Sequence, residues 1–112
     1  MRTFKNFAAQ GYVYIRRIEK LPENAIKVEA EDKHHVVSHS ETGHAHVLDS
    51  KKATMYNLPD SIMDCLLVVH DPVALEHLRN YDTHESILLD KGTYHIKRQR
   101  EWTPEGFRKV QD

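Results

Sequence analysis

Apolar and polar residues alternate with a period of two along much of the chain, in short runs that turn residues interrupt. Ile26-Lys27-Val28-Glu29 is the simplest example, and Thr93 to Trp102 is the clearest run. This alternation is typical of strands with one buried face, because successive side chains of a strand point to opposite sides. Cys65 to His70 is almost continuously apolar, which predicts a strand covered on both faces.

The other predicted strands are equally short, and Gly, Pro, Asn and Asp mark the turns between them. They are Tyr12–Ile18, Ile26–Glu29, His34–His39, His44–Leu48, Ala53–Leu58, Val73–Arg79 and Ile87–Leu89. Val73–Arg79 also fits two turns of helix, but its β-rich surroundings favour a strand. We expect residues 1–10 to be one helical turn or a flexible arm, and residues 103–112 to be a short tail that includes at most a helical turn.

About eight short strands, with turn signals roughly ten residues apart, predict an all-β fold, a small antiparallel β-barrel or sandwich with little helix. At 112 residues the chain is long enough for one modest core, so we expect a single β-domain over residues 1–112.

Composition excludes several classes of protein. Hydrophobic residues make up 39% and charged residues 29% of the chain, which is too apolar for a disordered protein. The single cysteine, Cys65, excludes an internal disulfide. No segment resembles a signal peptide or has the length and apolarity of a membrane-spanning helix. We therefore expect a cytoplasmic protein that does not enter a membrane.

Charge is unevenly distributed although the net charge is only −1. Residues 1–20 carry five Lys or Arg and one acid, residues 95–112 carry five and three, and residues 21–94 carry six and thirteen. If the two ends lie side by side in the fold, they form a basic patch beside an acidic body. A pI near 6.8 nevertheless argues against nucleic acid as a partner.

Histidine is the compositional outlier, with nine residues in the chain. Such enrichment is typical of metal binding or pH sensing. Three histidines and Glu41 fall within His39–His46. His44 and His46 lie two apart on a predicted strand, so their imidazoles share a face and could bind one ion together.

A complete metal site needs a further ligand from a distant part of the sequence. His77 and His84 are the best candidates, followed by His70, while His39 and Glu41 could contribute from the same segment as the pair. Imidazole ligands suit a divalent transition metal such as Zn, Fe, Ni or Mn. Three histidines with an open position would suit catalysis with Glu41 as general base, whereas four closed ligands would be structural. Histidines that only form structural hydrogen bonds, or a pH-responsive cluster, are the alternatives.

The last predicted strand offers a second group of residues. One of its faces presents Tyr94, Ile96, Arg98, Arg100 and Trp102. Arg98 and Arg100 between aromatic residues could bind an anionic ligand or a nucleic-acid backbone. Alternatively, the arginines lie over aromatic rings or pair with the acidic middle of the chain, and the low pI favours this structural interpretation.

The segments Gly43-His44-Ala45-His46 and Arg98-Gln99-Arg100-Glu101-Trp102 resemble motifs of a group of short uncharacterised bacterial and phage proteins. The strand start Tyr12–Arg17 and the turn Leu21-Pro22-Glu23 are similar to that group as well, so the resemblance covers nearly the whole chain. It implies no activity. It does imply that His44, His46 and His84 belong to one pattern.

The His-x-His pair is also similar to the first metal motif of cupins, which are small β-barrels. Cupins place a glutamate a few residues after the pair, where this chain offers only Asp49, and their second motif, Pro-x-Gly followed by His, is absent. The resemblance therefore implies an architecture and carries no function.

We expect, on these grounds, a His-rich, metal-binding β-domain that acts as an accessory or interaction module. Its partner would be another protein or a second copy bound through an edge strand. The alternatives are a small cupin-like metalloenzyme acting on an anionic small molecule held by Arg98 or Arg100, and a nucleic-acid-associated β-barrel.

Overall fold

The computed structural model describes residues 1–10, 13–30, 33–39, 45–78, 83–98, 100–103 and 106–109, and within these ranges the chain forms strands and no helix. The strands are β1 (Phe7–Gln10), β2 (Val13–Ile18), β3 (Ile26–Val28), β4 (His34–His39), β5 (Ala45–Asp49), β6 (Ala53–Leu58), β7 (Ser61–Val69), β8 (Val73–Leu78), β9 (Thr83–Leu89), β10 (Gly92–Arg98), β11 (Arg100–Thr103) and β12 (Gly106–Lys109). The predicted all-β class is confirmed, including the strand at Val73–Leu78 for which a helix was the alternative. No described segment forms a helix able to cross a membrane.

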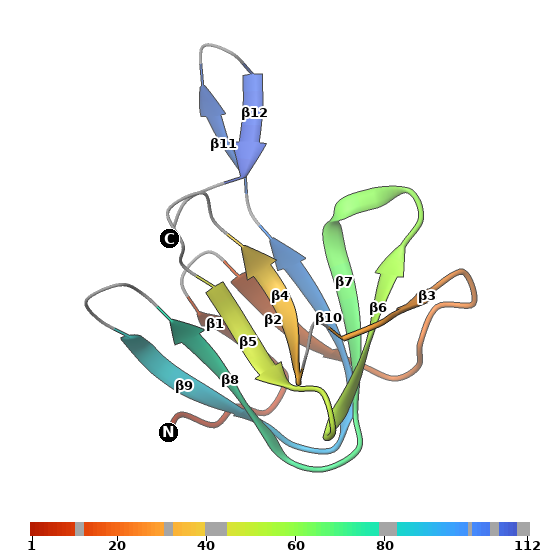
Figure 1. Cartoon of the computed structure of the whole chain (residues 1–112), viewed down its shortest axis with the longest axis vertical. Coiled ribbons are helices and arrows are strands. Elements are labelled where there is room, and N and C mark those ends of the chain that lie inside the picture. The colour runs from red at the N-terminus through yellow and green to blue at the C-terminus, as the bar shows by residue number, and fades with distance from the viewer. Residues whose placement is uncertain are drawn as a thin grey trace.

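Two antiparallel sheets make up the body of the molecule (Figure 1). One has six strands in the order β1-β2-β10-β7-β6-β3, and the other has four in the order β4-β5-β8-β9. A shared apolar core joins them, with Ile15 and Ile96 from the larger sheet and Leu75 and Ile87 from the smaller one, all fully buried. The arrangement is that of a sandwich, because each sheet buries one face against the other.

Burial along the strands follows the sequence pattern. In β2, Val13 and Ile15 are buried while Arg16 is exposed, which is the period-two alternation of a one-sided strand. In β7, Cys65, Leu66 and Leu67 are all buried, as the continuous apolar run predicted. The hydrophobic pattern thus determines both kinds of strand.

The first ten residues differ from the expectation of a helical turn or a flexible arm. Phe7–Gln10 forms β1 and pairs with β2, and the backbone of Arg2 hydrogen-bonds to both Ser86 and Leu88 on β9. Phe4 and Phe7 have helical spacing, but Ala8 and Gln10 are the buried positions, so the segment follows a period of two. Pairing with the edge of β2 supplies backbone hydrogen bonds that a short isolated helix would lack.

The end of the chain also differs from prediction. The expected last strand, Thr93 to Trp102, is divided between β10 and β11, and β11 pairs with β12 in a separate hairpin at the top of Figure 1. Residues 106–109 are therefore strand, where a tail with a helical turn was expected. Thr103 pairs with Gly106, so the turn signal at this point reverses the chain instead of ending the β-structure.

The two basic ends of the sequence meet in the larger sheet. β2 and β10 are neighbours, and their register places Arg16 opposite His95 and Tyr14 opposite Lys97. The two basic ends of the chain are therefore adjacent along β2 and β10, as a basic patch requires.

Candidate functional site

Two histidines stack inside the protein, between the sheets. His46 on β5 and His77 on β8 are register partners, with 1% and 0% of their surface exposed. Their ring centroids are 3.9 Å apart and the ring planes are 13° from parallel. Both side chains belong to the core-facing side of the smaller sheet, because Leu48 and Leu75, two residues away on the same strands, are buried there too.

Gln10 ties this pair to the larger sheet. Its Nε2 donates to the carbonyl of Leu75 at 2.8 Å, so its Oε1, 2.9 Å from Nδ1 of His46, is the acceptor. Nδ1 of His46 must then carry the proton, and in the neutral ring Nε2 carries the lone pair. Metal-binding histidines in proteins are held in this way, with one ring nitrogen donating to an oxygen and the other available as a ligand.

The histidine pair is the middle of a row across the four-stranded sheet. Ser38 on β4 pairs with His46, His46 with His77, and His77 with His84 on β9. Ser38 is also buried, at 6% exposure. Of His84 the structure describes the backbone position alone.

Two register shifts create this row. In the β4–β5 ladder the register changes between Val36 and Ser38, and in the β8–β9 ladder it changes between Leu75 and His77. Without these shifts Ser38 would face Ala45, and His77 would face a residue other than His84. Bulges commonly aim a side chain at a functional site and keep a neighbouring ladder intact.

The remaining predicted ligands are placed less completely. His44 and Glu41 lie outside the described residues. His39 is the last residue of β4 and the register partner of Ala45, so it is one residue beyond Ser38 of the histidine row. The structure does not describe its side chain. His70 directly follows the end of β7, and its Nε2 hydrogen-bonds to Thr54 on β6 of the larger sheet, at 2.9 Å. Among the side chains that the structure describes, no three His, Cys, Asp or Glu residues gather into a metal-binding group.

The predicted arginine-bearing face of the last strand points into the protein. Tyr94 and Ile96 are fully buried, and Nη1 of Arg98 donates to the carbonyl of Ile62 at 2.7 Å. Arg100 belongs to β11, and its side chain lies outside the described ones. Among the described side chains, Arg17 lies over an aromatic ring, with its guanidinium carbon 4.9 Å from the centroid of Tyr94. Arg98 therefore bonds a backbone carbonyl, which neither the ligand-binding prediction nor the structural alternative specified, and Arg17 was not among the arginines considered.

Two further histidines have distinct environments. Burial lowers the pKa of His35, outweighing its backbone hydrogen bond with Ala53 and the charge of Glu29, so its neutral form is favoured. His95 bonds Asp64 through Nε2 at 2.7 Å. Burial alone would raise the pKa of Asp64, but hydrogen bonds from Ser61 and His95 and the nearby charges lower it. Neither environment joins the buried histidine row.

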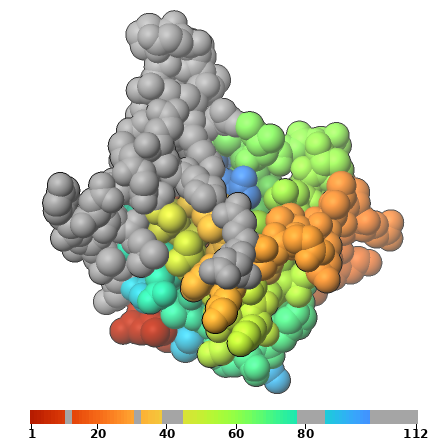
Figure 2. Space-filling model, in the orientation of Figure 1, coloured from red at the N-terminus to blue at the C-terminus, as the bar shows by residue number. Residues whose placement is uncertain are grey.

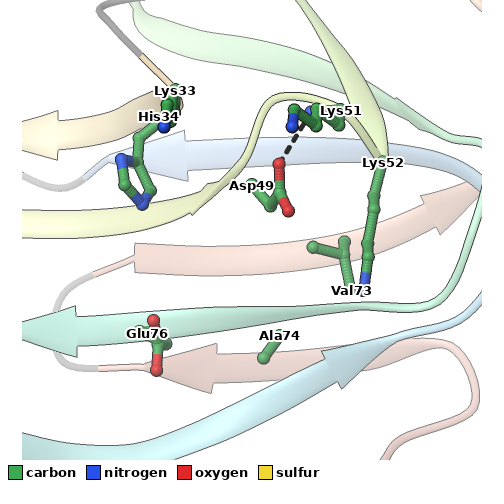
Figure 3. A pocket seen from close by; sticks show the side chains of 8 residues that line it. All are labelled: Lys33, His34, Asp49, Lys51, Lys52, Val73, Ala74 and Glu76. Carbon is green, nitrogen blue, oxygen red and sulfur yellow. Dashed lines mark hydrogen bonds between the residues drawn. The ribbon is translucent and has the colours of Figure 1, made fainter.

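A surface hollow of about 380 Å³ lies on the outer side of the smaller sheet (Figure 3). Lys33, His34, Lys51 and Lys52 line it together with Asp49 and Glu76. Asp49 accepts a hydrogen bond from the backbone of Lys51 at 2.8 Å, which fixes the turn after β5. Because cations and carboxylates are mixed there, the hollow has no single charge to offer a ligand. It is also separated from the buried histidines by the sheet itself.

The comparisons with known proteins give a family and no activity. A family model described as "Domain of unknown function (DUF8820)" matches residues 9–99. No curated protein and no solved structure matches the chain. The matched range includes Gln10, His46, His77 and His84, and so contains the whole of the candidate site.

Proposed function

The chain belongs to the DUF8820 family of domains of unknown function, and for this member we propose that it is a metal-binding β-domain whose histidine row holds one divalent transition metal ion. His46, His77 and His84 would be its ligands. We propose further that the domain acts in the cytoplasm as an accessory or interaction module. The cytoplasmic location fits the single cysteine, because disulfides are rare in that compartment.

The observation that carries this proposal is the pair of register shifts beside the histidines. Two irregular ladders flank a sheet row in which three histidines from β5, β8 and β9 are consecutive. Bulges are frequent at sheet edges and next to functional sites, and these two lie in the ladders of the edge strands β4 and β9, beside the histidines. Convergence of imidazoles on an ion is a reason for lining up three histidines, since a metal needs three or four ligands at one point.

The surroundings of His46 support the same function. The hydrogen bond with Gln10 orients the ring and sets its tautomer, as outer partners of metal ligands do. Neutral imidazoles suit Zn, Fe, Ni or Mn, and a fourth ligand would complete the coordination. His44 and His39 remain predicted ligands from the segment beside Ala45.

Burial favours a structural or accessory metal over a catalytic one. His46 and His77 are almost fully enclosed, and neither lines the two surface hollows on the outer faces of the sheets. A metalloenzyme would need an open position that substrate can reach. Arg98, one of the two proposed substrate-holding arginines, is instead bonded to the backbone of Ile62.

The test is metal stoichiometry in protein purified without an affinity tag and without chelators. Elemental analysis and calorimetric titration with Zn²⁺ should give about one ion per chain, with three histidine ligands. The variants His77→Phe, His84→Ala and the double variant His44→Ala with His46→Ala should abolish binding. His70→Ala is the matched control, because His70 follows the end of β7 and bonds Thr54 on the other sheet.

Thermal unfolding of each variant shows whether the fold survives the substitution. A folded wild-type protein that contains no metal and titrates none would contradict the proposal. Equal loss of binding in His70→Ala and His77→Phe would also contradict it, because binding would then depend on histidine number and not on the row.

A further inference from the structure

A second hollow, of about 360 Å³, lies on the outer face of the six-stranded sheet. Its lining residues are Phe7 from β1, Tyr14 and Arg16 from β2, and His95 and Lys97 from β10. These three strands are neighbours. The residues that alternate with them, such as Ile15 and Ile96, point into the core, so the five form one continuous outer surface. We refer to these five residues as the aromatic–basic face.

The register arranges aromatic and basic side chains in adjacent rows. Phe7 pairs with Arg16, and Arg16 pairs with His95. In the next row on the same face, Tyr14 pairs with Lys97. Side chains directly opposite each other on antiparallel strands lie about 5 Å apart at Cβ, so each ring has a cation as its neighbour.

The aromatic part of this face is exposed. Phe7 has 59% of its surface accessible, and its ring lies near that of Tyr14, with centroids 6.2 Å apart and planes 21° from parallel. A pair of nearly parallel rings, with Phe7 exposed and Tyr14 half-buried, is a surface on which a planar group can stack. The core does not require this arrangement, because neither ring contributes to it.

The basic part is oriented by contacts at its border. Asp64 holds Nε2 of His95 at 2.7 Å and accepts a further hydrogen bond from Ser61. This network fixes the imidazole on the sheet surface beside Arg16 and Lys97, both of which are exposed. Arg16 is exposed on this face, where its guanidinium can meet an anion from solution.

We propose that the aromatic–basic face binds single-stranded nucleic acid, with bases stacked on Phe7 and Tyr14 and phosphates held by Arg16 and Lys97. Exposed aromatic rings between cations on an antiparallel sheet provide the two contacts that such strands need. A duplex would not fit this chemistry, because its bases are already stacked on each other.

The overall pI does not decide against this partner, because the charge is segregated. Residues 1–20 and 95–112, which include β1, β2 and most of β10, each carry five Lys or Arg, against one and three acids. The acidic excess belongs to the rest of the chain. Charge complementarity with phosphate is therefore local to this sheet, and long-range attraction depends on such local fields.

This face is independent of the proposed metal site. It lies on the outer side of the larger sheet, whereas His46 and His77 lie on the inner side of the smaller one. Loss of metal binding would leave the nucleic-acid proposal unaffected, and the reverse also holds.

Fluorescence anisotropy with labelled oligothymidine and oligouridine of about twelve nucleotides tests the proposal, since this length covers the usual site size of small β-domains. Wild-type protein should bind at least one of the two strands, more weakly as salt rises. Phe7→Ala should weaken binding by about 5- to 150-fold, the loss expected for one stacked base. Lys97→Ala should reduce the salt dependence by about one phosphate contact.

Two matched controls lie elsewhere on the surface. Ile62→Ala truncates an even more exposed apolar residue, at 71% exposure, and Lys51→Ala removes the same charge from the turn after β5. Both should bind like the wild type. A wild-type protein that binds neither oligonucleotide would overturn the proposal. So would a duplex that binds as tightly as the single strands, or controls that lose as much affinity as Phe7→Ala. A preference for one sugar would support it and identify the strand.

Discussion

His46 and His77 stack face to face, 3.9 Å between ring centroids, although they belong to different strands and are separated by thirty residues of sequence that include all of β6 and β7. Polar rings of this kind are costly to bury unless they form hydrogen bonds or bind a ligand. For His46 one such bond comes from Gln10 on the opposite sheet. The pair is thus part of a polar connection through an otherwise apolar core.

Replacing Gln10 tests that connection directly. Gln10→Leu removes a donor to the Leu75 carbonyl and an acceptor for His46. Each buried group left unsatisfied costs about 1–3 kcal/mol, so the free energy of unfolding should fall by a few kcal/mol. If the histidine row binds a metal, its affinity should also fall by about 10- to 100-fold, the usual cost of losing an outer partner.

Urea unfolding and Zn²⁺ titration measure the two effects of the Gln10 variant separately. Gln10→Glu is the informative companion, because a carboxylate still accepts from Nδ1 of His46 but cannot donate to Leu75. It should retain more metal affinity than Gln10→Leu. Unchanged stability in Gln10→Leu would show that the two hydrogen bonds contribute nothing net to the fold.

The local pattern predicts the strands well, because alternation between apolar and polar residues is a property of neighbouring positions. It predicts which residues share a face, such as Tyr94 with Ile96 and His95 with Lys97. It cannot say which of the two faces is covered. The ligand-binding arginines were expected on the Tyr94 side, and at Tyr94 and Ile96 that side is the core.

The histidine row could not be predicted in full for a different reason. His77 and His84 were the best distant candidates, and the register makes them partners. That partnership depends on irregular ladders, and a bulge has no clear signal in a single sequence. The contact of Gln10 with His46 could not be predicted, because Gln10 lies on β1. The helical spacing of Phe4 and Phe7 had indicated a helical turn or an arm in this segment.

Asp64 should make stability depend on pH in the acid range. Its folded-state pKa is lowered from an ordinary value near 3.8, chiefly because hydrogen bonds from Ser61 and His95 outweigh the effect of burial. The unfolded state then binds the proton first as pH falls, so this contribution is complete above the unfolded pKa and is lost as pH falls through the folded pKa. Asp64→Asn should cost about 1–3 kcal/mol at neutral pH.

The difference in unfolding free energy between wild type and Asp64→Asn, measured in urea from neutral pH to below about pH 4, should shrink in the acid range. Asp71→Asn, an exposed acid in the turn after β7, is the matched control and should change stability by less than about 0.5 kcal/mol. A difference that stays constant across this range would contradict the assignment to Asp64.

Gly92 has a conformation and a neighbour that exclude a side chain. Its φ is +150°, and a Cβ there would collide with Nη1 of Arg17. Arg17 cannot easily move, because it donates to the Lys91 carbonyl at 3.0 Å and to the Tyr94 hydroxyl at 2.7 Å. Gly92→Ala should therefore destabilise the protein by about 1–3 kcal/mol, with some further loss if Arg17 is displaced.

A double-mutant cycle separates the two causes at Gly92. In an Arg17→Ala background the collision disappears and only the backbone strain remains, so Gly92→Ala should cost less there than in the wild type. Denaturant unfolding of the four proteins gives the coupling. Equal costs in both backgrounds would mean that Arg17 yields without loss and that strain alone makes glycine necessary.

The short strand β3 is the edge at which we expect a second copy of the chain to bind. Within the described part of the chain it pairs with β6 alone, and Ile26 is 55% exposed there. The orange segment at the right of the molecule in Figure 2 includes this strand. An edge strand presents unpaired N–H and C=O groups that another strand can satisfy.

Ile26→Lys should oppose this association, because it places a charge at the proposed contact. Light scattering over a range of protein concentrations should then show a dimer for the wild type and a monomer for the variant. Ile62→Lys, at a more exposed position on the interior strand β7, should leave the dimer intact. A wild-type protein that remains monomeric at high concentration would contradict assembly through this edge.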